Sequence, residues 1–395
     1  MSRQANTPFG QPPSGQPPSG QPASGQPAAT VLIMAGGTGG HIFPGLAVAA
    51  SLRRRGVEVR WLGARGGMES RQVPPRGIEL DVVDIAGLRG KGAARWLLAP
   101  WQLLRAVAQA ARLLGAHRPA CAISFGGYAA GPGGLAARLR GIPLLVHEQN
   151  RVPGVTNRVL ARFAVRVLQA FPGTWDERQR PLTCGNPVRR EVTALPAPAD
   201  RLAGRDGPVR LLVTGGSQGA QALNRLLPAA LALLPADLQI EVRHQCGRNR
   251  EEATRAAYEA AGIAVTVTEF IDDMAEAYGW ADLVVCRAGA LTVSEVAAAG
   301  LPAVFLPFPH AVDDHQTRNA EFLVERGAAV LLPEVFTEAA DLAAVLAGLL
   351  QDPGKRLEMA VRARAVAIPD AADRVAALCA EFLGTARPSG QAEAA

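Results

Sequence analysis

The feature that most limits the fold of this chain is a unit of buried strand, glycine-rich loop and helix that occurs in each half. In the first half, residues 30–35 (TVLIMA) run into the glycines of residues 36–40 and an alanine-rich helix. In the second half, residues 209–214 (VRLLVT) run into residues 215–221 (GGSQGAQ) and another helix. Further strand-like runs alternate with helical stretches, a pattern typical of parallel sheets covered by helices. The sequence therefore predicts an α/β protein with two Rossmann-like, doubly wound domains that face each other across a cleft.

Length and composition agree with two domains of this class. The 395 residues exceed the about 250 to 300 at which a single core stops growing. Hydrophobic residues make up 48% of the chain but aromatic residues only 5%, which fits Ala, Leu and Val in helices on buried sheets and argues against a β-sandwich. Residues 1–29 repeat Gln, Pro, Ser and Gly, so we expect a disordered tail, with a proline-rich docking segment as the alternative. Residues 385–395 are also expected to be loose.

Charge and cysteine content limit the partners and the compartment. The formal net charge of +6 permits attraction to nucleic acid, anionic lipid or phosphorylated small molecules. The five cysteines are scattered without metal-type spacing, which predicts neither disulfides nor a zinc site and indicates a reducing, cytoplasmic setting. The first residues lack the apolar segment of a secretory signal, and no run of about 18 apolar residues occurs, so we expect no span across a bilayer.

Each glycine-rich loop lies between a strand and a helix, where backbone N–H groups and the positive helix end can bind an anion. The alternative is that glycine only permits a tight turn. The dinucleotide fingerprint G-x-G-x-x-G is not met, because Ile42 stands at the third glycine position. Glu58 lies about 20 residues downstream, where that fingerprint has its ribose ligand, so a dehydrogenase-like module stays an alternative. No Walker A lysine follows either loop.

Two histidine-containing segments of the first half are candidates for catalysis. His41 comes directly after the first glycine loop, where an imidazole can take a proton from an attacking hydroxyl. A histidine that only bonds the loop is the alternative. Residues 147–150 (HEQN) end another buried strand, so four polar side chains are expected at the cleft. Asn150 is predicted to bind sugar hydroxyls, and Glu148 is either a weaker candidate base or an acceptor for backbone donors.

A candidate nucleotide site lies in the second half. Arg189, in the segment GNPVRR, is placed to neutralise a phosphate, with an exposed hinge arginine as the alternative. Residues 288–295 (AGALTVSE) open a helix, where small residues let a phosphate approach the helix N-terminus. Glu295 is predicted to bind both hydroxyls of a ribose, and a capping box between Thr292 and Glu295 is the alternative.

Two further segments are rich in polar or basic residues. Residues 307–320 contain two Asp and two His whose spacing matches no zinc pattern, so a hydroxyl-binding loop is predicted. Residues 87–105 interleave basic residues with Trp and Leu, a pattern suited to an anionic membrane surface. The side chains expected at that surface are Trp96, Leu97, Trp101, Arg89, Lys91, Arg95 and Arg105. A crossover helix with basic ends is the close alternative, and RNA binding is disfavoured because no recognised motif accompanies the charge.

Together these motifs resemble the family-28 glycosyltransferases of bacterial peptidoglycan synthesis, which add N-acetylglucosamine to a lipid-linked muramyl-pentapeptide. The likeness covers residues 31–384, with GGTGGHIFPG, HEQN, GNPVR, GGSQGA, FIDDM and RAGALTVSE in the family's order. It implies the GT-B fold, an inverting mechanism and UDP-N-acetylglucosamine as donor, with no cofactor or metal. It also implies that residues 30–186, joined by a C-terminal helix at about 365–384, receive the acceptor and contact the membrane, and that residues 187–364 bind the donor.

The resemblance assigns donor contacts residue by residue. They fall on Thr38, Gly39, Gly40, Asn150, Arg189, Ser217, Ile271, Ala290, Leu291, Thr292, Val293, Ser294, Glu295 and Gln316. Ile271 would pack on the uracil or meet its pairing edge through backbone atoms. The sequence departs from the family pattern at residues 310–316, where residues 311–315 replace a more basic run, and at residues 151–153, where smaller residues are expected. The implied location is peripheral, on the cytoplasmic face of the bacterial plasma membrane.

Other functions stay open at the level of the sequence. A lipid galactosyltransferase or a UDP-N-acetylglucosamine 2-epimerase would be a related nucleotide-sugar enzyme. A non-catalytic nucleotide-binding module would need only the two glycine loops. Turnover that depends on a lipid-linked acceptor distinguishes these possibilities.

Overall fold

The computed structural model describes residues 29–85, 93–216, 219–309 and 311–385. The predicted tails, apart from residues 29 and 385, lie outside the described residues, as do Ser217, Arg89 and Lys91. The side chains of residues 93–98 lie outside them as well, and these include Arg95, Trp96 and Leu97. Within the described part of the chain, no helix is long and apolar enough to cross a membrane.

The first domain is built on a seven-stranded parallel sheet in the order β3-β2-β1-β4-β5-β6-β7. Its strands are β1 (Thr30–Ala35), β2 (Glu58–Ala64), β3 (Glu79–Val83), β4 (Cys121–Gly126), β5 (Leu144–Glu148), β6 (Arg166–Gln169) and β7 (Leu182–Thr183). Its helices are α1 (Gly39–Arg54), α2 (Glu69–Gln72), α3 (Ala93–His117), α4 (Ala130–Leu139) and α5 (Val155–Leu160), with 3₁₀ turns at Pro74–Arg76 and Glu177–Gln179. Every residue of β4 is buried, because helices cover both faces of the sheet.

The second domain is built on a six-stranded parallel sheet in the order β10-β9-β8-β11-β12-β13. Its strands are β8 (Val209–Thr214), β9 (Ile240–Gln245), β10 (Val265–Thr268), β11 (Leu283–Cys286), β12 (Ala303–Phe305) and β13 (Ala329–Leu331). The helices from the linker onward are α6 (Arg190–Thr193), α7 (Pro198–Leu202), α8 (Gln221–Leu231), α9 (Glu251–Ala260), α10 (Met274–Trp280), α11 (Ala290–Ala299), α12 (His315–Val324), α13 (Ala339–Leu350), α14 (Pro353–Ala365) and α15 (Ala371–Ala380). Short 3₁₀ turns lie at Val312–Asp314, Glu334–Phe336 and Leu383–Thr385.

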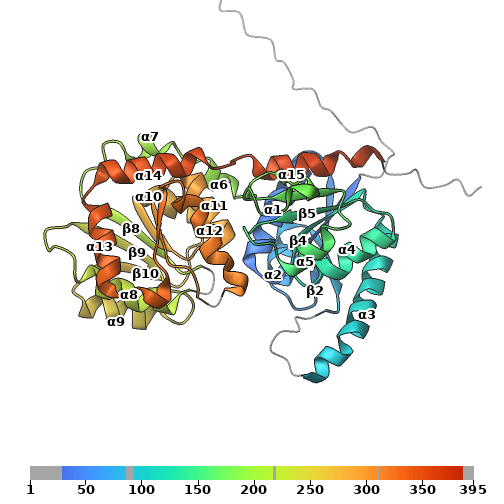
Figure 1. The fold of residues 1–395 in the computed structure, drawn as a ribbon, viewed down its shortest axis with the longest axis horizontal. Helices are drawn as coiled ribbons and strands as arrows, with labels where there is room; N and C mark the ends of the chain where they lie inside the picture. The colour runs from blue at the N-terminus through green and yellow to red at the C-terminus, as the bar shows by residue number, and fades with distance from the viewer. Residues whose placement is uncertain (1–28, 86–92, 217–218, 310, 386–395) are drawn as a thin grey trace, which may run out of the picture.

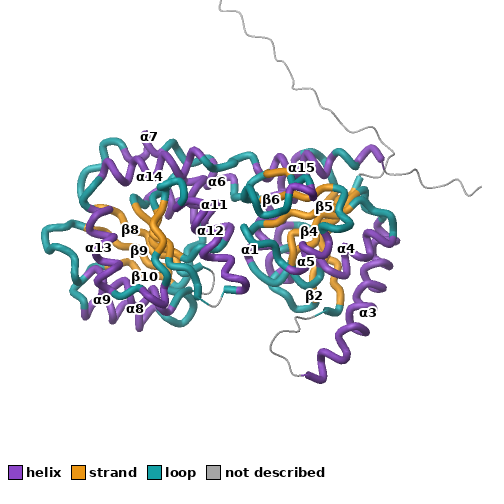
Figure 2. Tube along the Cα trace, in the orientation of Figure 1, coloured by secondary structure: helices purple, strands orange, loops and turns teal. Residues whose placement is uncertain are grey.

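In both sheets the strand order reverses beside the first strand of the domain. Strand β1 has β2 on one side and β4 on the other, and β8 has β9 on one side and β11 on the other. Ligands of doubly wound folds bind outside the carboxyl ends of the strands at such a reversal. The predicted pair of Rossmann-like domains is confirmed, with strands flanked by helices in each (Figure 2).

Two element boundaries differ from the sequence prediction. Helix α1 begins at Gly39, so Gly39 and Gly40 lie in its first turn rather than in the loop before the helix. Pro44 lies inside this helix and has no N–H to donate to the carbonyl four residues earlier. Strand β5 ends at Glu148, so the first two residues of the HEQN segment belong to the sheet and not to the loop.

The last helices lie against different domains. Helix α14 packs beside α11 in the second domain, while α15 lies over α1 in the first (Figure 1). Asp373 of α15 bonds the Ser51 hydroxyl and lies 3.0 Å from the Arg54 guanidinium. Cys379 completes the contact, because its carbonyl accepts the Cys121 thiol at 3.6 Å. The chain therefore crosses back to the first domain between α14 and α15.

Candidate active site where the two sheets face each other

The first glycine loop ends in the N-terminus of α1, and His41 lies in the first turn of that helix. Thr38 is the N-cap, and no side chain caps the helix, so its first N–H groups and positive dipole end can meet an anion. The Nδ1 atom of His41 lies 3.0 Å from the carbonyl oxygen of Gly36. Because a carbonyl only accepts hydrogen bonds, Nδ1 donates and Nε2 is left as the acceptor of the ring.

Gly126, the last residue of β4, keeps space around Nε2 of His41. A Cβ atom at this glycine would lie 3.2 Å from Nε2, which is tighter than most real Cβ contacts. Gly126 also has a φ of +101°, a conformation that L side chains rarely adopt. The imidazole is left half-exposed at the strand reversal, as suits a base that meets an incoming hydroxyl.

Burial changes the expectation for the HEQN segment. His147 is fully buried, its Nε2 lies 2.9 Å from the Gly185 carbonyl, and burial lowers its pKa to about 4. Glu148 is also buried, and its two oxygens accept from the backbone N–H groups of residues 149, 150 and 154 and from two side-chain amides. The prediction of four polar side chains at the site is therefore wrong, because only Asn150 of the four is partly exposed. Glu148 has the backbone-acceptor role that the sequence left open.

Asn150 joins the two domains. Its Oδ1 accepts from the side-chain amide of Asn319 on α12 at 3.1 Å. The same Asn319 accepts the N–H of Arg151 at 2.9 Å and donates to the Ala288 carbonyl at 3.3 Å. Asn319 of α12 therefore links the loop after β5 to the loop that opens α11, the helix predicted to bind the nucleotide.

Arg189 and Glu295, both predicted to bind the donor, form an ion pair with each other. The guanidinium lies 2.9 Å from Oε1 of Glu295, and the other oxygen accepts the Tyr278 hydroxyl at 3.2 Å. Burial raises the pKa of the Glu295 carboxyl, and the charge and hydrogen bonds of Arg189 oppose that rise. The Arg189 side chain is 40% exposed, so the hinge arginine is half-exposed and paired rather than free in solvent.

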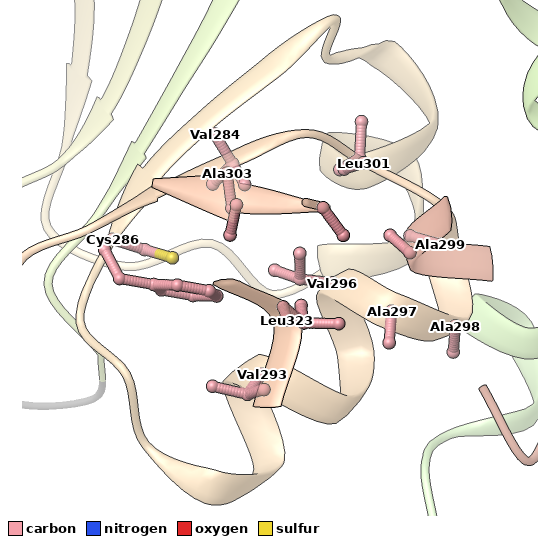
Figure 3. Close-up of a cluster of buried hydrophobic side chains, with 14 of the residues drawn as sticks. Val284, Cys286, Val293, Val296, Ala297, Ala298, Ala299, Leu301, Ala303 and Leu323 are labelled. Atoms are coloured by element: carbon pink, nitrogen blue, oxygen red, sulfur yellow. The ribbon is translucent and has the colours of Figure 1, made fainter. Parts of the chain in front are cut away.

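Helix α11 begins at Ala290 with Gly289 as its N-cap, and no side chain caps it. The capping-box alternative is therefore wrong, because Glu295 lies in the second turn of the helix and its carboxylate is directed to Arg189. Val293 packs with its neighbours in the second-domain core (Figure 3), and its N–H bonds the Gly289 carbonyl. The predicted contact at Val293 is wrong for these reasons. Leu291 and Thr292 are the partly exposed side chains at this N-terminus, which leaves backbone N–H groups to meet an anion.

The remaining predicted contacts lie around the same edge of the second sheet. Gln316 accepts the N–H of Phe308 at 3.0 Å, so it orders the loop after β12. Ser294 donates to the Ala290 carbonyl at 2.9 Å and accepts from Asn186 of the linker. Ile271 is half-buried against the second-domain core. In the described ranges, no group of three or more His, Cys, Asp or Glu side chains could hold a metal ion.

Residues 93–105, the described part of the predicted membrane segment, form the start of the long helix α3. Of its described side chains, Trp101 is 67% exposed and Leu104 is 61% exposed. Arg105 is exposed too, although it lies 3.6 Å from the Asp84 carboxylate. The helix projects away from the body of the first domain at this end (Figure 1). The described side chains of Trp101, Leu104 and Arg105 therefore form an exposed surface of two apolar residues and one basic residue.

Four residues that organise the site were missed at the sequence level: Glu69, Asn157, Asn319 and Tyr278. Glu69 is fully buried and accepts the N–H groups of Ala64 at 2.7 Å and Gly37 at 3.2 Å. Asn157 accepts the Ser124 hydroxyl at 2.8 Å and donates to Glu148 at 2.9 Å. Flanking glycines were the available signal for Glu69; nothing comparable marks the others.

Comparison with known proteins agrees with this geometry. The model of the glycosyltransferase family 28 N-terminal domain matches residues 31–169, and that of the family 28 C-terminal domain matches residues 210–375. A protein of Xanthomonas campestris pv. campestris (strain 8004) is 59% identical over 359 residues, covering 90% of this chain and 83% of the relative. One from Xylella fastidiosa (strain M12) is 55% identical over 352 residues, covering 89% and 95%. Both relatives are called UDP-N-acetylglucosamine--N-acetylmuramyl-(pentapeptide) pyrophosphoryl-undecaprenol N-acetylglucosamine transferase.

The comparison with solved structures agrees with the family and sequence matches. The crystal structure of Acinetobacter baumannii MurG superposes with a TM-score of 0.79 at 42% identity, covering 89% of this chain and 99% of that one. The calicheamicin glycosyltransferase CalG4, at 17% identity and a TM-score of 0.63, covers 91% and 100% and shares the fold. Two facing Rossmann-like domains with these matches define a glycosyltransferase of the GT-B class. Within that class, the chain belongs to glycosyltransferase family 28.

Proposed function

We propose that this glycosyltransferase moves N-acetylglucosamine from UDP-N-acetylglucosamine to undecaprenyl-pyrophosphoryl-N-acetylmuramyl-pentapeptide. The observation that carries the proposal is the 59% identity, over 90% of the chain, to a relative named for this transfer. The product is the disaccharide-pentapeptide lipid of peptidoglycan synthesis. The first domain receives the acceptor, and the second domain holds the donor.

In the proposed reaction, a hydroxyl of the muramyl sugar attacks the anomeric carbon of the donor with inversion. The bond from that carbon to the diphosphate oxygen breaks, UDP leaves, and the hydroxyl proton passes to Nε2 of His41. The hydrogen bond of Nδ1 to Gly36 supports this role, because it leaves Nε2 as the acceptor. Glu148 is a poorer base, since five N–H donors already surround its carboxylate.

The N-terminus of α11 and the Arg189–Glu295 pair support the assignment of the donor to the second domain. Its diphosphate lies at the N-terminus of α11, where the N–H groups of residues 290–292 and the dipole stabilise the charge that develops on leaving. Glu295 binds the ribose while it stays paired with Arg189, whose exposed side turns to the phosphates. The other proposed contacts are Thr38, Gly39, Gly40, Asn150, Ser217, Ile271, Ala290, Leu291, Thr292, Ser294 and Gln316.

The enzyme is further proposed to act at the cytoplasmic face of the plasma membrane as a peripheral protein. Its acceptor carries a polyprenyl chain that stays in the bilayer, so the first domain must approach the lipid surface. The exposed Trp101 and Leu104 on α3 support this, because apolar side chains flanked by basic residues suit an anionic interface.

One assay separates this function from its alternatives. Purified protein is mixed with labelled UDP-N-acetylglucosamine, with and without the lipid-linked muramyl-pentapeptide. Label transferred to lipid only when the acceptor is present is the expected result. Release of UDP without acceptor would instead indicate an epimerase, and binding without turnover would indicate a nucleotide-binding module.

A further inference from the structure

The peptide group that joins Gly36 and Gly37 is hydrogen-bonded at both ends by ionisable side chains. Its carbonyl oxygen accepts Nδ1 of His41 at 3.0 Å. Its N–H group donates to Oε2 of Glu69 at 3.2 Å. A carboxylate, a single peptide and an imidazole therefore form one continuous chain of hydrogen bonds.

The position of Glu69 is tightly specified by its surroundings. The side chain is fully buried, and its other oxygen accepts the N–H of Ala64 at 2.7 Å. A Cβ atom at Gly36, Gly63 or Gly67 would lie 2.5 Å from a Glu69 side-chain atom, so a larger residue at any of these places would displace Glu69. Burying a carboxylate is costly unless N–H donors satisfy it. The fold therefore encloses this carboxylate and points one oxygen at the glycine loop.

We propose that Glu69 is a positioning residue for His41 and acts through the peptide between Gly36 and Gly37. A charged acceptor polarises the peptide that donates to it, and chained hydrogen bonds strengthen one another. The Gly36 carbonyl becomes a better acceptor, which holds the proton of the neutral imidazole on Nδ1 and keeps Nε2 ready to act as base. The same polarisation stabilises the imidazolium that forms when the acceptor hydroxyl loses its proton. In hydrolases a carboxylate does this by direct contact with histidine.

This inference rests on the proposed role of His41 as the base, so its test is a double-mutant cycle. Transfer is measured at saturating donor and acceptor for wild type, Glu69→Gln, His41→Ala and the double variant. Glu69→Gln keeps the shape of the side chain but removes the charge. We expect Glu69→Gln to lower kcat about 10- to 100-fold, as loss of an orienting carboxylate does at other sites, with little change in donor KM. In the His41→Ala background, the same change is expected to alter kcat less than about twofold, because its target is gone.

Asp81→Asn is the matched control, since this carboxylate of the first domain is paired with Arg60 away from the loop, and kcat should not change. An equal loss of kcat from Glu69→Gln with and without His41 would overturn the inference, because Glu69 would then act only on the loop. If His41→Ala leaves kcat within a few-fold of wild type, the base assignment and this inference fall together, while acceptor-dependent transfer would still stand.

A second measurement does not depend on whether a Glu69 variant folds. In wild-type protein labelled with ¹⁵N-histidine, the signals of His41 are assigned by their loss in His41→Ala. The inference requires the neutral ring to carry its proton on Nδ1. A ring protonated on Nε2 would show that the hydrogen-bond chain does not operate, and would overturn it.

Discussion

At the scale of single residues, burial separates the candidate bases of the motifs from one another. His147 and Glu148 are buried and bonded within the fold, whereas His41, in the first turn of α1, is half-exposed. A buried charge is stable only when donors or a counter-charge surround it, and Glu148 and Glu295 satisfy this in two different ways. The proposed removal of a proton from the acceptor hydroxyl is therefore assigned to His41, the partly exposed side chain of the three.

The first prediction concerns His41 as base. The His41→Ala variant should transfer N-acetylglucosamine about 10²- to 10⁴-fold more slowly at saturating substrates, because general base catalysis contributes a factor of this size. The melting temperature should change little, since the side chain is half-exposed. His117→Ala, on α3 and remote from the glycine loop, is the control and should keep full turnover. Turnover of His41→Ala within a few-fold of wild type would refute the assignment.

The second prediction concerns the pH dependence of stability through His147. Burial lowers the pKa of this residue to about 4, against about 6.5 in the unfolded chain. The unfolded state therefore binds the extra proton between these pH values, and stability is lost as pH falls through this window. By pH 4 the loss attributable to this group should be about 3 kcal/mol.

The His147→Gln variant isolates this contribution, because glutamine can still donate to the Gly185 carbonyl but does not titrate. Urea unfolding followed at pH 7, 5.5 and 4 gives the free energy of unfolding for both proteins. The variant should lose less stability than wild type on acidification. If the free energy of unfolding falls equally with pH in both proteins, His147 is not the cause of the acid-induced loss of stability.

The positions of some predicted site residues follow directly from the order of elements along the chain, while their chemical roles stay predictions. His41 and Asn150 follow strand ends, and the structure places them beside the strand reversal or the domain contact. Glu69 was missed because its contact with the Gly37 N–H depends on how a short helix folds back over the loop. Asn319 was missed for the same reason, since its partners lie in another domain and in a distant loop. Such contacts are created by packing and leave no periodic signal in the sequence.

At the scale of elements, α11 and α3 serve opposite purposes. The inner face of α11 is built from Val and Ala, which pack against β11 and β12 and hold the helix N-terminus rigidly at the sheet edge (Figure 3). A fixed N-terminus can stabilise charge without reorganisation during reaction. Helix α3 instead leaves Trp101 and Leu104 uncovered. An exposed apolar surface marks an interaction site, and a membrane is the partner proposed for this one.

The third prediction concerns this surface of α3. The double variant Trp101→Ser and Leu104→Ser should sediment with phosphatidylglycerol vesicles at least about tenfold less than wild type, since each side chain contributes about 1.5 to 3 kcal/mol on burial. Added salt should weaken binding of both proteins, because basic residues contribute about 1 kcal/mol each.

The matched control for the α3 surface is Phe336→Ser, which removes an apolar side chain that is 82% exposed on the second domain. It should leave sedimentation unchanged. Vesicle binding that is indifferent to both the α3 substitutions and salt would exclude this surface as the membrane contact. Turnover with a water-soluble acceptor should be unaffected in all three proteins.

At the scale of the whole molecule, the repeated unit of strand, glycine loop and helix was enough to predict two doubly wound domains. Parallel strands need crossover helices, so the alternation of elements specifies the class of fold. The alternation of strands and helices did not predict the contacts between the domains. Arg151 was noted only as a departure from a family pattern, yet its side chain reaches α12 of the other domain. Interdomain pairs depend on the relative placement of two bodies, which no local pattern encodes.

The fourth prediction is that the ion pairs of Arg151 stabilise the contact between the two domains. Its guanidinium lies 2.9 Å from Glu325 and 3.8 Å from Glu321, and the pair with Glu325 is partly exposed at 24% and 51%. A pair of this exposure contributes about 0.2 to 1 kcal/mol, enough to shift an open-to-closed equilibrium up to about fivefold. Arg151→Glu turns the attraction into repulsion. It should raise the donor KM several-fold and increase the radius of gyration measured by X-ray scattering.

Reversing the charge of Glu325 as well distinguishes an effect of the interdomain ion pair from a local structural defect at Arg151. Adding Glu325→Arg to Arg151→Glu restores opposite charges across the interface, so donor KM and radius of gyration should return toward wild type. Arg318→Ala is the control, because it removes an ion pair within α12 while the interdomain pair remains. Salt should raise the donor KM of wild type more than that of Arg151→Ala, since only wild type has an attraction to screen. If Arg151→Glu changes neither quantity, the N–H bond from Arg151 to Asn319 holds the domains without help from the charge.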